Sequence, residues 1–348
     1  MAKVTLQSIA DRVGVSRMTV SNAFSRPDQL SAELRERILA AADELGYVGP
    51  DPAARALARG KVGSIGLLLT DELSQAFQDH VATEFLSSVA DALTREGLAL
   101  TLLTSGDATG APAGYVPARD VAMDGAIVYI CDPASPEIGW LERRGLPLVS
   151  VDHDPSPNAP SINVDDRGGA RAAAQHLVDL GHRRVGILAL ETQYQVDGQP
   201  SWNWPARERM AGWMEALGAA GIEPVVKAAR WRPSGAVVTT ARELLDRPDR
   251  PSAVLCFSDA FAVETMQVAQ SLGLRVPEDL SIVGFDDSPL AVAASPQLTT
   301  VHQEVSSKGK EAVRALMSVM ATTEPGPVER VLLPASLVVR ESTAPARD

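Results

Sequence analysis

The stretch LQSIADRVGVSRMTVSNAF, residues 6–24, predicts two short α-helices joined by a tight turn. Its apolar residues between Leu6 and Val13 recur at the i, i+3, i+4, i+7 spacing of a helix with one buried face. Thr5 can cap the first helix, Gly14 ends it, and Ser16 can cap the second. The pair therefore needs a further element to complete its core.

A third helix is predicted after Ser31, with an apolar stripe that includes Leu34, Ile38 and Leu39. Two short helices around a glycine, closed by a third, are the pattern of a helix-turn-helix unit. In such a unit the second helix enters the major groove of DNA with its N-terminus first. The same spacing also fits a plain three-helix scaffold with a solvated outer face, so periodicity alone leaves both interpretations open.

The second helix carries side chains that suit DNA. Arg17 can form a fork of hydrogen bonds to guanine, and Asn22 can pair with adenine or with a phosphate. Thr19, Ser21 and the helix N-termini suit phosphate contacts. We therefore expect the DNA-binding residues of this unit to be Thr5, Ser16, Arg17, Met18, Thr19, Ser21 and Asn22.

The charge distribution agrees with DNA binding at one end of the chain. The 348 residues carry a net charge of −12, which argues against a protein that coats nucleic acid. Residues 1–60, however, hold eight basic and seven acidic residues, and residues 1–26 hold four basic residues against Asp11 alone. A polyanion is therefore expected to meet this protein at its N-terminal part.

Composition and length indicate a soluble protein of two or three domains, with 45% hydrophobic and 22% charged residues. No apolar run is long enough for a membrane span, and no signal peptide is recognisable, so we expect a cytoplasmic protein without a membrane partner. Cys131 and Cys256 lie in apolar runs and are predicted to be reduced core residues. The five histidines show no metal-ligand spacing, so no metal site is expected.

The rest of the chain alternates short apolar runs with longer amphipathic ones. The runs SIGLLL, LALTLL, GAIVYI, PLVSV, VGILAL, AVLCF and SIVGF are predicted to be parallel strands buried on both faces. Helices are predicted near 84–95, 170–180, 206–220 and 259–272. The set divides near residue 161 into two units of similar order, which predicts two doubly wound lobes with a cleft between them.

Ligands of such folds bind beyond the carboxyl ends of the strands. Polar residues follow several predicted strands there, namely Thr70, Asp71, Asp152, Ser258, Asp259, Asp286 and Asp287. Asp259 and Asp287 equally suit capping of the next helix or loop. Catalytic motifs are absent: the chain has no G-x-S-x-G, H-E-x-x-H, P-loop or strand-linked G-x-G-x-x-G, and Ser307 with Lys310 matches S-x-x-K only by chance on a polar helical face. We expect neither an enzyme nor a cofactor.

Several segments together resemble the lactose-repressor/galactose-repressor (LacI/GalR) family of bacterial transcription regulators. These segments are VTLQSIADRVGVSRMTVSNAF (4–24), LSAELRERILAAADELGY (30–47), HLVDLGHRRVGIL (176–188), LGLRVPEDLSIVGFDDSP (272–289) and LTTVHQE (298–304). The resemblance spans nearly the whole chain. It implies that Arg17, Met18 and Asn22 select the operator sequence, although Asn22 departs from the arginine of some members.

Residues 47–60, YVGPDPAARALARG, are similar to the hinge of that family, although the pattern alone also fits a plain linker. The helical part is too short to be stable alone. The resemblance implies that hinge helices from two subunits pair in the minor groove, with Leu57 wedged between base steps, Ala53 and Ala54 at the close approach, and Arg55 near phosphate. Asp51 stands where the family often has Asn.

The resemblance also implies the domain organisation. We expect a helix-turn-helix domain at 1–48, a hinge at 49–61, a two-lobed domain like periplasmic sugar-binding proteins at 62–340, and a tail at 341–348. The first lobe would comprise about 62–161 with 294–324, and the second about 162–293 with 325–340.

The effector site follows from the resemblance and from the strand ends. Arg209 matches the ligand-binding arginine of the family, with Asp286 as its partner across the cleft, and Trp231 aligns with a ligand contact. Trp213 is predicted to be a core residue. The loop QYQVDGQPSWNWP, with Trp202 and Trp204, either roofs the pocket or elaborates the surface. The expected effector residues are Asp71, Phe77, Asp152, Arg209, Trp231, Ser258 and Asp286.

The sequence thus predicts a homodimeric repressor that binds near-palindromic double-stranded operator DNA and senses a small polar effector, a carbohydrate. The alternative is a two-lobed solute-binding protein or enzyme whose N-terminal helices serve another interaction.

Overall fold

The computed structural model describes residues 4–49, 51–69, 73–104, 115–131, 135–191, 194–196, 199–230, 235–322 and 327–347. The chain divides into two compact units, Met1–Gly63 and Ser64–Asp348. Each is described by itself.

The first unit contains the predicted three-helix core. Its elements are α1 (Leu6–Val13), α2 (Arg17–Ser25), the 3₁₀ turn η1 (Pro27–Gln29), α3 (Ala32–Glu44) and α4 (Pro52–Arg59). Thr5, Ser16 and Ser31 cap α1, α2 and α3 as predicted, and Gly14 ends α1 with a φ of 78° that favours glycine. Buried Ile9, Val20, Ile38 and their neighbours fill the space between α1, α2 and α3. The local sequence therefore accounts for this unit.

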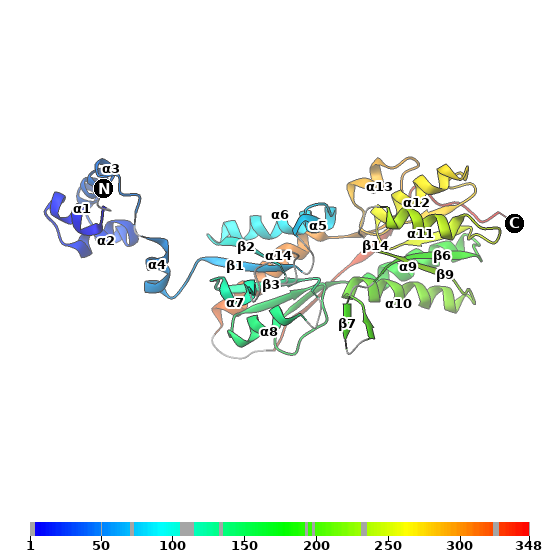
Figure 1. The fold of residues 1–348 in the computed structure, drawn as a ribbon, viewed down its shortest axis with the longest axis horizontal. Helices are drawn as coiled ribbons and strands as arrows, with labels where there is room; N and C mark the ends of the chain where they lie inside the picture. Colours follow the sequence, from blue (N-terminus) through cyan, green and yellow to red (C-terminus); the bar gives the residue numbers. More distant parts are fainter. Residues whose placement is uncertain are drawn as a thin grey trace. The chain divides into compact units, whose positions relative to one another are not determined.

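Two parallel sheets organise the second unit (Figure 1). The first has the order β13-β5-β4-β3-β1-β2, and the second has the order β11-β10-β6-β9. The strands of the first are β1 (Ser64–Leu69), β2 (Ala99–Thr104), β3 (Gly125–Tyr129), β4 (Leu148–Val151), β5 (Ser161–Val164) and β13 (Arg330–Leu333). Those of the second are β6 (Val185–Leu190), β9 (Val225–Ala229), β10 (Ala253–Cys256) and β11 (Ser281–Val283). We call the parts built on these sheets lobe 1 and lobe 2.

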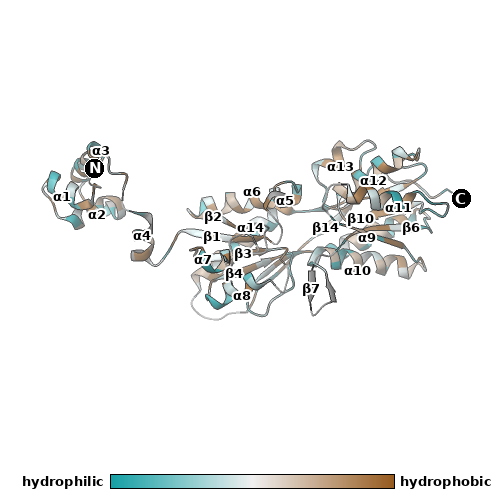
Figure 2. Ribbon diagram, in the orientation of Figure 1, coloured by the Kyte–Doolittle hydropathy of each residue, from teal (hydrophilic) through white to brown (hydrophobic). Residues whose placement is uncertain are grey.

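Helices cover both faces of each sheet, as expected for strands that are apolar on both sides. The helices of lobe 1 are α5 (Leu73–Ala76), α6 (His80–Arg95), α7 (Pro117–Asp120), α8 (Pro136–Arg143) and α14 (Val305–Ala321). Those of lobe 2 are α9 (Asp166–Asp179), α10 (Trp204–Ala219), α11 (Ala236–Leu245), α12 (Asp259–Ser271) and α13 (Pro289–Ala293). In Figure 2, helices such as α8 and α11 carry both hydrophilic and hydrophobic residues, the pattern of a helix with one buried face.

Close helix packing depends on two glycines. A Cβ atom at Gly212 of α10 would collide with the carbonyl oxygen of Arg167, so α10 can lie directly against α9. A Cβ atom at Gly309 of α14 would lie 2.6 Å from Oγ of Ser88 in α6. A hydrogen bond of 2.6 Å from Oγ of Ser88 to the carbonyl oxygen of Ser306 also joins α6 to α14. Gly309 therefore brings this end of α14 into the interior of lobe 1.

The chain crosses between the lobes later than the sequence predicted. β5 pairs with β4, and β13 pairs with β5, so both strands belong to lobe 1 rather than to lobe 2. The segment 294–303 belongs with lobe 2, because Thr299 bridges Val283 and His302 bridges Asp286. Within this segment, β12 (Thr300–Gln303) pairs antiparallel with β14 (Ala335–Val338). The expected boundaries near 161, 293 and 324 were too early, because the places of β5, β13 and the segment 294–303 are decided by long-range pairing and not by a local pattern.

Residues 342–346 are not a free tail, which corrects the expectation for 341–348. Ser342 is fully buried, and its hydroxyl donates to the carbonyl oxygen of Ile282 at 2.6 Å. His182 contacts the carbonyl oxygen of Ala344 through Nε2 at 3.1 Å, and its Nδ1 contacts Oγ of Ser252 at 2.9 Å. The histidine therefore has a structural role and holds the C-terminal segment against lobe 2.

The predicted core residues are confirmed. Cys131 and Cys256 are buried, and Trp213 is 2% exposed. Within the described residues, no helix is long and apolar enough to cross a membrane, and no group of three or more His, Cys, Asp or Glu side chains could hold a metal ion.

Asp259 joins three segments of lobe 2. It is 1% exposed, and its carboxylate accepts hydrogen bonds from the backbone N–H of Ser288 at 2.7 Å and from the hydroxyl of Thr300 in β12. Burial raises the pKa of Asp259 from 3.8 to about 6. The structural interpretation of this residue therefore holds, and the protonated form is favoured by folding.

We predict a pH dependence of stability at this position. A carboxyl group whose pKa is raised by folding contributes stability that is fully present below pH 3.8 and is lost as the pH rises through about 6. The shift corresponds to a loss of about 3 kcal/mol in unfolding free energy. Asp259→Asn mimics the protonated acid. In urea unfolding, the unfolding free energy of the wild type should therefore fall relative to that of the variant as the pH rises from 4 to 7. A difference that stays constant over this range would contradict the assignment.

Candidate functional site

The outer face of α2 carries the side chains predicted to meet DNA. Arg17 and Met18 are exposed, with Met18 at 69%, and no neighbouring helix of the described unit covers them. Ser16 caps the helix by accepting the backbone N–H of Thr19 at 3.0 Å, and its hydroxyl lies 2.8 Å from that of Thr19. Thr5 accepts the N–H of Ser8 at 3.4 Å. The two caps therefore occupy helix N-termini, where phosphate oxygens are favourably bound.

The far end of α2 holds a contact that the sequence did not predict. Nδ2 of Asn22 donates to Oε1 of Gln29 in η1 at 3.2 Å. The amide of Asn22 is thereby oriented, and Gln29 is brought beside it as a further polar group. Ser21 is half-buried, and its carbonyl oxygen accepts the hydroxyl of Ser25 at 2.9 Å.

The predicted hinge segment is helical. Asp51 Oδ1 accepts the N–H of Ala54 at 3.4 Å, so this acid caps α4. Arg55 is exposed, and Leu57 is 87% exposed. Ala53 lies in α4, but its side chain is outside the described part.

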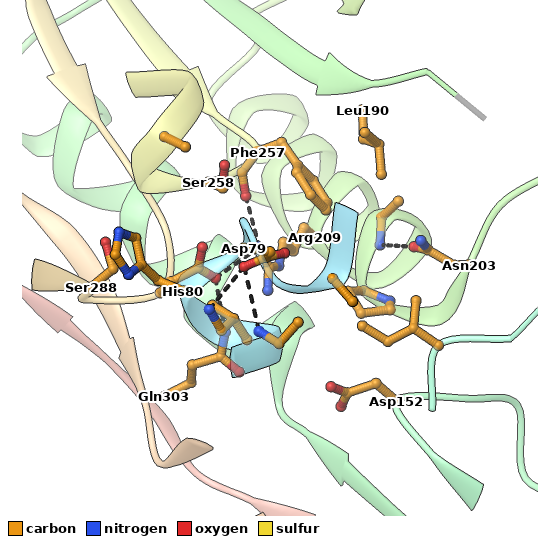
Figure 3. Close-up of a pocket in the computed structure, with 18 of the residues that line it drawn as sticks. Asp79, His80, Asp152, Leu190, Asn203, Arg209, Phe257, Ser258, Ser288 and Gln303 are labelled. Carbon is orange, nitrogen blue, oxygen red and sulfur yellow. Dashed lines mark hydrogen bonds and ion pairs between the residues drawn. The ribbon is translucent and has the colours of Figure 1, made fainter. Parts of the chain in front are cut away.

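A cavity of about 250 Å³ lies in the second unit and is lined from both lobes. Lobe 1 contributes the segment before and at the start of α6, the ends of β3 and β4, and α14. Figure 3 shows Asp79, His80 and Asp152 from this lobe. Lobe 2 contributes the start of α10, the ends of β6, β10 and β11, and the loop before α13. The polar lining residues include Asp79, Asp152, Glu191, Asn203, Arg209, Ser258, Asp286, Gln303 and Lys308. The cavity therefore lies at the carboxyl ends of both sheets, as predicted for this fold.

Arg209 is the central cation of the cavity wall. Its Nε donates to Oδ1 of Asp166 at 2.8 Å, and its Nη1 donates to the carbonyl oxygen of Phe257 at 2.7 Å. The same Nη1 lies 3.3 Å from Oδ1 of Asp286, and the guanidinium lies 3.7 Å from the ring centroid of Phe285. Arg209 and Asp286 both belong to lobe 2, so this pair does not span the cleft, contrary to the sequence-based expectation.

Lys308 and Gln303 form the polar connection between the two lobes instead. Nζ of Lys308, which is 1% exposed, forms a buried ion pair with Oδ2 of Asp152 in lobe 1 and donates to Oε1 of Gln303 at 3.0 Å. Nε2 of Gln303 then donates to Oδ1 of Asp286 in lobe 2 at 2.8 Å. Gln303 is the last residue of the crossing strand β12. A continuous chain of buried polar contacts thus runs from lobe 1 through a crossing segment to lobe 2.

Burial raises the pKa of three carboxyl groups around the cavity. These are Asp79, Asp166 and Asp286, and for the last two the positive charge of Arg209 opposes the effect of desolvation. For Asp286, the negative charges of Asp259 and Asp79 raise the pKa further. Asp286 has a φ of 115°, and Asp152 has a φ of 48°. Positive φ angles at non-glycine residues store backbone strain, which is a common feature of binding sites.

Four of the seven predicted effector residues border the cavity: Asp152, Arg209, Ser258 and Asp286. Asp71 and Trp231 lie outside the described residues. Phe77 is 55% exposed and is not among the described residues of the lining, whereas Ala76 and Gln78 are. The structure therefore does not place Phe77 in the cavity wall, and its role in effector binding stays a prediction.

Several lining residues were not predicted from the sequence. Asp79 and Asn203 carry a recognisable signal, because each caps the helix that follows it. The pattern around Lys308 predicts the wrong environment. Its segment SSKGK is typical of an exposed helix face, but Gly309 brings it into the interior. Asp287, in contrast, does not border the cavity in the described part. Its carboxylate pairs with Arg340 at 2.5 Å and lies 3.0 Å from Nδ1 of His302, which settles its role as structural.

The loop before α10 contributes to the cavity. β7 (Tyr194–Val196) and β8 (Gln199–Ser201) form a short antiparallel hairpin, and Trp202 and Asn203 after it are lining residues. Trp204 is not among the described lining residues, and its ring lies under the guanidinium of Arg207 at 5.1 Å. Of the two tryptophans, Trp202 therefore supports the roof interpretation, and Trp204 serves packing.

The fold and the cavity define a two-lobed ligand-binding protein that carries a helix-turn-helix unit. Residues 5–49 match the family described as bacterial regulatory proteins, lacI family, and residues 174–343 match the periplasmic binding protein-like domain. The chain is 37% identical over 339 residues to the HTH-type transcriptional regulator IpsA of Corynebacterium glutamicum, with 91% of each chain covered. The chain belongs to the lacI family of bacterial regulatory proteins.

Solved structures agree with this assignment. The CelR–cellobiose complex has 29% sequence identity and a TM-score of 0.70, with 98% of this chain and 100% of that chain covered. The lac repressor dimer bound to operator and the anti-inducer ONPF has 26% identity and a TM-score of 0.80, with 98% and 99% covered. The protein is a transcriptional regulator and not an enzyme, since its relatives are named HTH-type transcriptional regulators.

We predict that Lys308 stabilises the protein mainly by neutralising Asp152. Lys308→Met leaves a buried carboxylate without its partner and should lower the unfolding free energy by roughly 3–5 kcal/mol. Adding Asp152→Asn removes that charge, and Asn tolerates the positive φ, so the double variant should recover most of the loss. Urea unfolding of the full chain followed by circular dichroism measures both effects.

The matched control is Lys310→Met, an exposed lysine of the same helix, which should change the unfolding free energy by less than about 0.5 kcal/mol. Equal effects of Lys308→Met and Lys310→Met would show that the buried pair contributes nothing.

Proposed function

We propose that this regulator is a homodimeric repressor whose affinity for a near-palindromic operator is controlled by a sugar-like ligand in the cavity. The observation that carries the proposal is the cavity itself, which both lobes line and which touches a strand that crosses between them. A ligand held by both lobes binds one lobe arrangement better than others and shifts the population toward it. Its influence on operator affinity equals its difference in affinity for the two states.

The lining suits a polyhydroxylated ligand. Carboxylates, the amides of Asn203 and Gln303, and the hydroxyl of Ser258 offer both acceptors and donors for hydroxyl groups. Trp202 and Phe257 offer aromatic surface, which packs against the C–H side of a sugar ring. The cavity is smaller than the ~300–1,000 Å³ of pockets for drug-sized ligands, which favours a ligand of about one sugar ring. The bound cellobiose of the CelR structure shows that a related protein binds a carbohydrate.

The proposal for DNA rests on the exposed residues of the first unit. Arg17 and Met18 start α2, which in helix-turn-helix proteins is the end that reaches base edges. A two-fold dimer presents two such helices, so it requires mirrored half-sites. In this proposal Leu57 of each α4 is the side chain that inserts between base steps of the minor groove, where its exposed surface is buried.

We predict that Arg17→Ala weakens operator binding by roughly 1–3 kcal/mol and relaxes the base preference at one position of each half-site. The reason is the loss of a bidentate contact to a base edge. Competition gel shifts with operators substituted at each position measure the preference. Arg12→Ala is the control, because Arg12 of α1 is already paired with Glu44 at 3.2 Å. Equal weakening on all sequences would instead make Arg17 a phosphate contact.

We predict that Asp286→Asn abolishes the response to effector but keeps operator affinity. The substitution removes the negative charge beside Arg209 and Gln303, and Asn tolerates the positive φ of this position. Operator titrations with and without effector measure both quantities. Asp279→Asn, an aspartate paired with Arg275 outside the described lining, should respond normally. An unchanged response of the Asp286 variant would refute the assignment of the cavity.

A further inference from the structure

An ion pair joins the two lobes beside the cavity. Nη1 and Nη2 of Arg207 in α10 donate to Oδ2 and Oδ1 of Asp154 at 3.0 Å and 2.7 Å, and Asp154 lies in the loop between β4 and β5 of lobe 1. The contact is bidentate, which is the strong and directional form of an arginine–carboxylate pair. Neither residue is among the described lining residues, but Asp152 and Ala206, close to them in the chain, are. The pair therefore lies at the edge of the cavity and not in its wall.

The loop that carries Asp154 is anchored to lobe 1 at several points. The backbone N–H of His153 donates to Oδ1 of Asn163 in β5 at 3.2 Å, and Nδ2 of Asn163 donates to the carbonyl oxygen of His153 at 3.1 Å. Nη1 of Arg330 in β13 donates to the carbonyl oxygen of Ala159, near the other end of the loop, at 2.6 Å. An anchored loop has little freedom left to lose, so the entropy cost of forming the ion pair is reduced on this side.

Arg207 is held in place on the lobe 2 side. Its guanidinium lies 5.1 Å from the ring centroid of Trp204, and its Nε lies 3.2 Å from Oε1 of Glu208. A planar guanidinium that stacks on a ring keeps its fork of donors in one direction. Here the fork meets the carboxylate of Asp154, so both partners are oriented before the lobes meet.

The strength of this ion pair depends on the surrounding salt. The side chains of Arg207 and Asp154 are 41% and 42% exposed, so water and dissolved ions reach both charges. An exposed ion pair of this kind shifts an equilibrium by about fivefold at most, and added salt screens it. The ion pairs made by Arg209 and Lys308 are buried, and salt screens such pairs much less. The contact at the edge of the cavity can therefore open while the polar network in the cavity wall stays intact.

We propose that Arg207 and Asp154 form a salt-sensitive latch that holds the lobes together at the edge of the cavity. The latch joins the lobes through their own side chains, so it acts whether or not the cavity is occupied. Its opening separates the start of α10 from the loop after β4 and exposes the lining nearby, including Trp202. Low ionic strength favours the closed arrangement, and high ionic strength favours access to the cavity. The proposal depends neither on the identity of a ligand nor on operator binding.

Thiol labelling of the full chain measures the opening without a ligand. Ala260→Cys places a thiol at a half-buried lining position of α12, an element that carries neither latch residue. The probe is 4,4′-dithiodipyridine, which is uncharged, and the parent chain gives the background of the buried Cys131 and Cys256. In this background, Asp154→Asn should speed labelling about two- to fivefold at low salt, because it removes the ion pair. A labelling rate equal to that of the chain with Asp154 overturns the proposal.

The matched control is an ion pair of the same helix that stays within one lobe. Glu215 of α10 pairs with Arg167 of α9, so Glu215→Gln should leave the labelling rate unchanged. Arg207→Gln should speed labelling, and adding Asp154→Asn to it should bring no further increase, because the two residues act through each other. An additive increase in the double variant contradicts the latch.

Ionic strength tests the electrostatic origin. Raising NaCl from about 50 mM to about 500 mM shortens the Debye length from about 14 Å to about 4 Å. The chain with an intact latch should then label about two- to fivefold faster, whereas the Asp154→Asn chain should change little. The same salt response in both chains contradicts the proposal.

Quenching of Trp202 by acrylamide gives a second measurement of the opening. The difference between each chain and its Trp202→Phe counterpart isolates the signal of this lining residue. Asp154→Asn changes lobe 1 and leaves α10 intact, so a larger quenching constant for Trp202 in this variant reports that the lobes separate. An unchanged quenching constant overturns the proposal. Urea unfolding excludes a general loss of stability: faster labelling that is matched by an equal change in the unfolding equilibrium constant also overturns it.

Discussion

The pairing of buried carboxylates with two buried cations is the constraint on which the ligand-binding unit depends. Asp152 and Asp166 are almost fully buried, and Asp286 lies close to them in the wall of the cavity. Charged groups in such surroundings persist only when they are paired and hydrogen-bonded. Lys308 and Arg209 supply the pairing, and Gln303 links the two groups. The lining of the cavity is thus fixed before any ligand arrives, which lowers the entropic cost of binding.

The same contacts connect the cavity to the segments that join the lobes. Gln303 ends β12, Lys308 begins α14 soon afterwards, and Thr300 of β12 is bound to Asp259. Any change in how the lobes meet must therefore alter the hydrogen bonds of residues that also line the cavity. This shared use of a few side chains is a physical basis for linkage between ligand affinity and lobe arrangement. It requires no separate pathway through the core.

The N-terminal unit is stabilised by helix caps and a small apolar core rather than by buried ion pairs. Its helices are short, so caps and a small apolar core carry a large share of their stability. The polar residues that would meet DNA are outside that core, and Leu57 is exposed although it is apolar. Stability and recognition are thus assigned to different faces of the same helices.

The sequence by itself determined the elements and their order, because caps, glycines and apolar periodicity act between residues that are near one another in the chain. It predicted α1, α2 and α3 with their caps, the long buried strands, the cavity at the strand ends, and Asp152, Arg209, Ser258 and Asp286 as its residues. It did not predict β5 and β13, whose places depend on pairing in the first sheet, and the lobe boundaries were therefore misplaced.

Only the tertiary structure decided which charges meet. Lys308 and Asp152 are 156 residues apart, and no local pattern connects them. Gly309 allows α14 to approach α6, which turns an apparently polar helix face into the interior. The tertiary structure also decided that Ala76 lines the cavity whereas Phe77 is exposed. It placed His182 against Ala344, which is 162 residues away in the chain. Electrostatic pairing depends on distance in space, and distance in space is set by packing rather than by sequence separation.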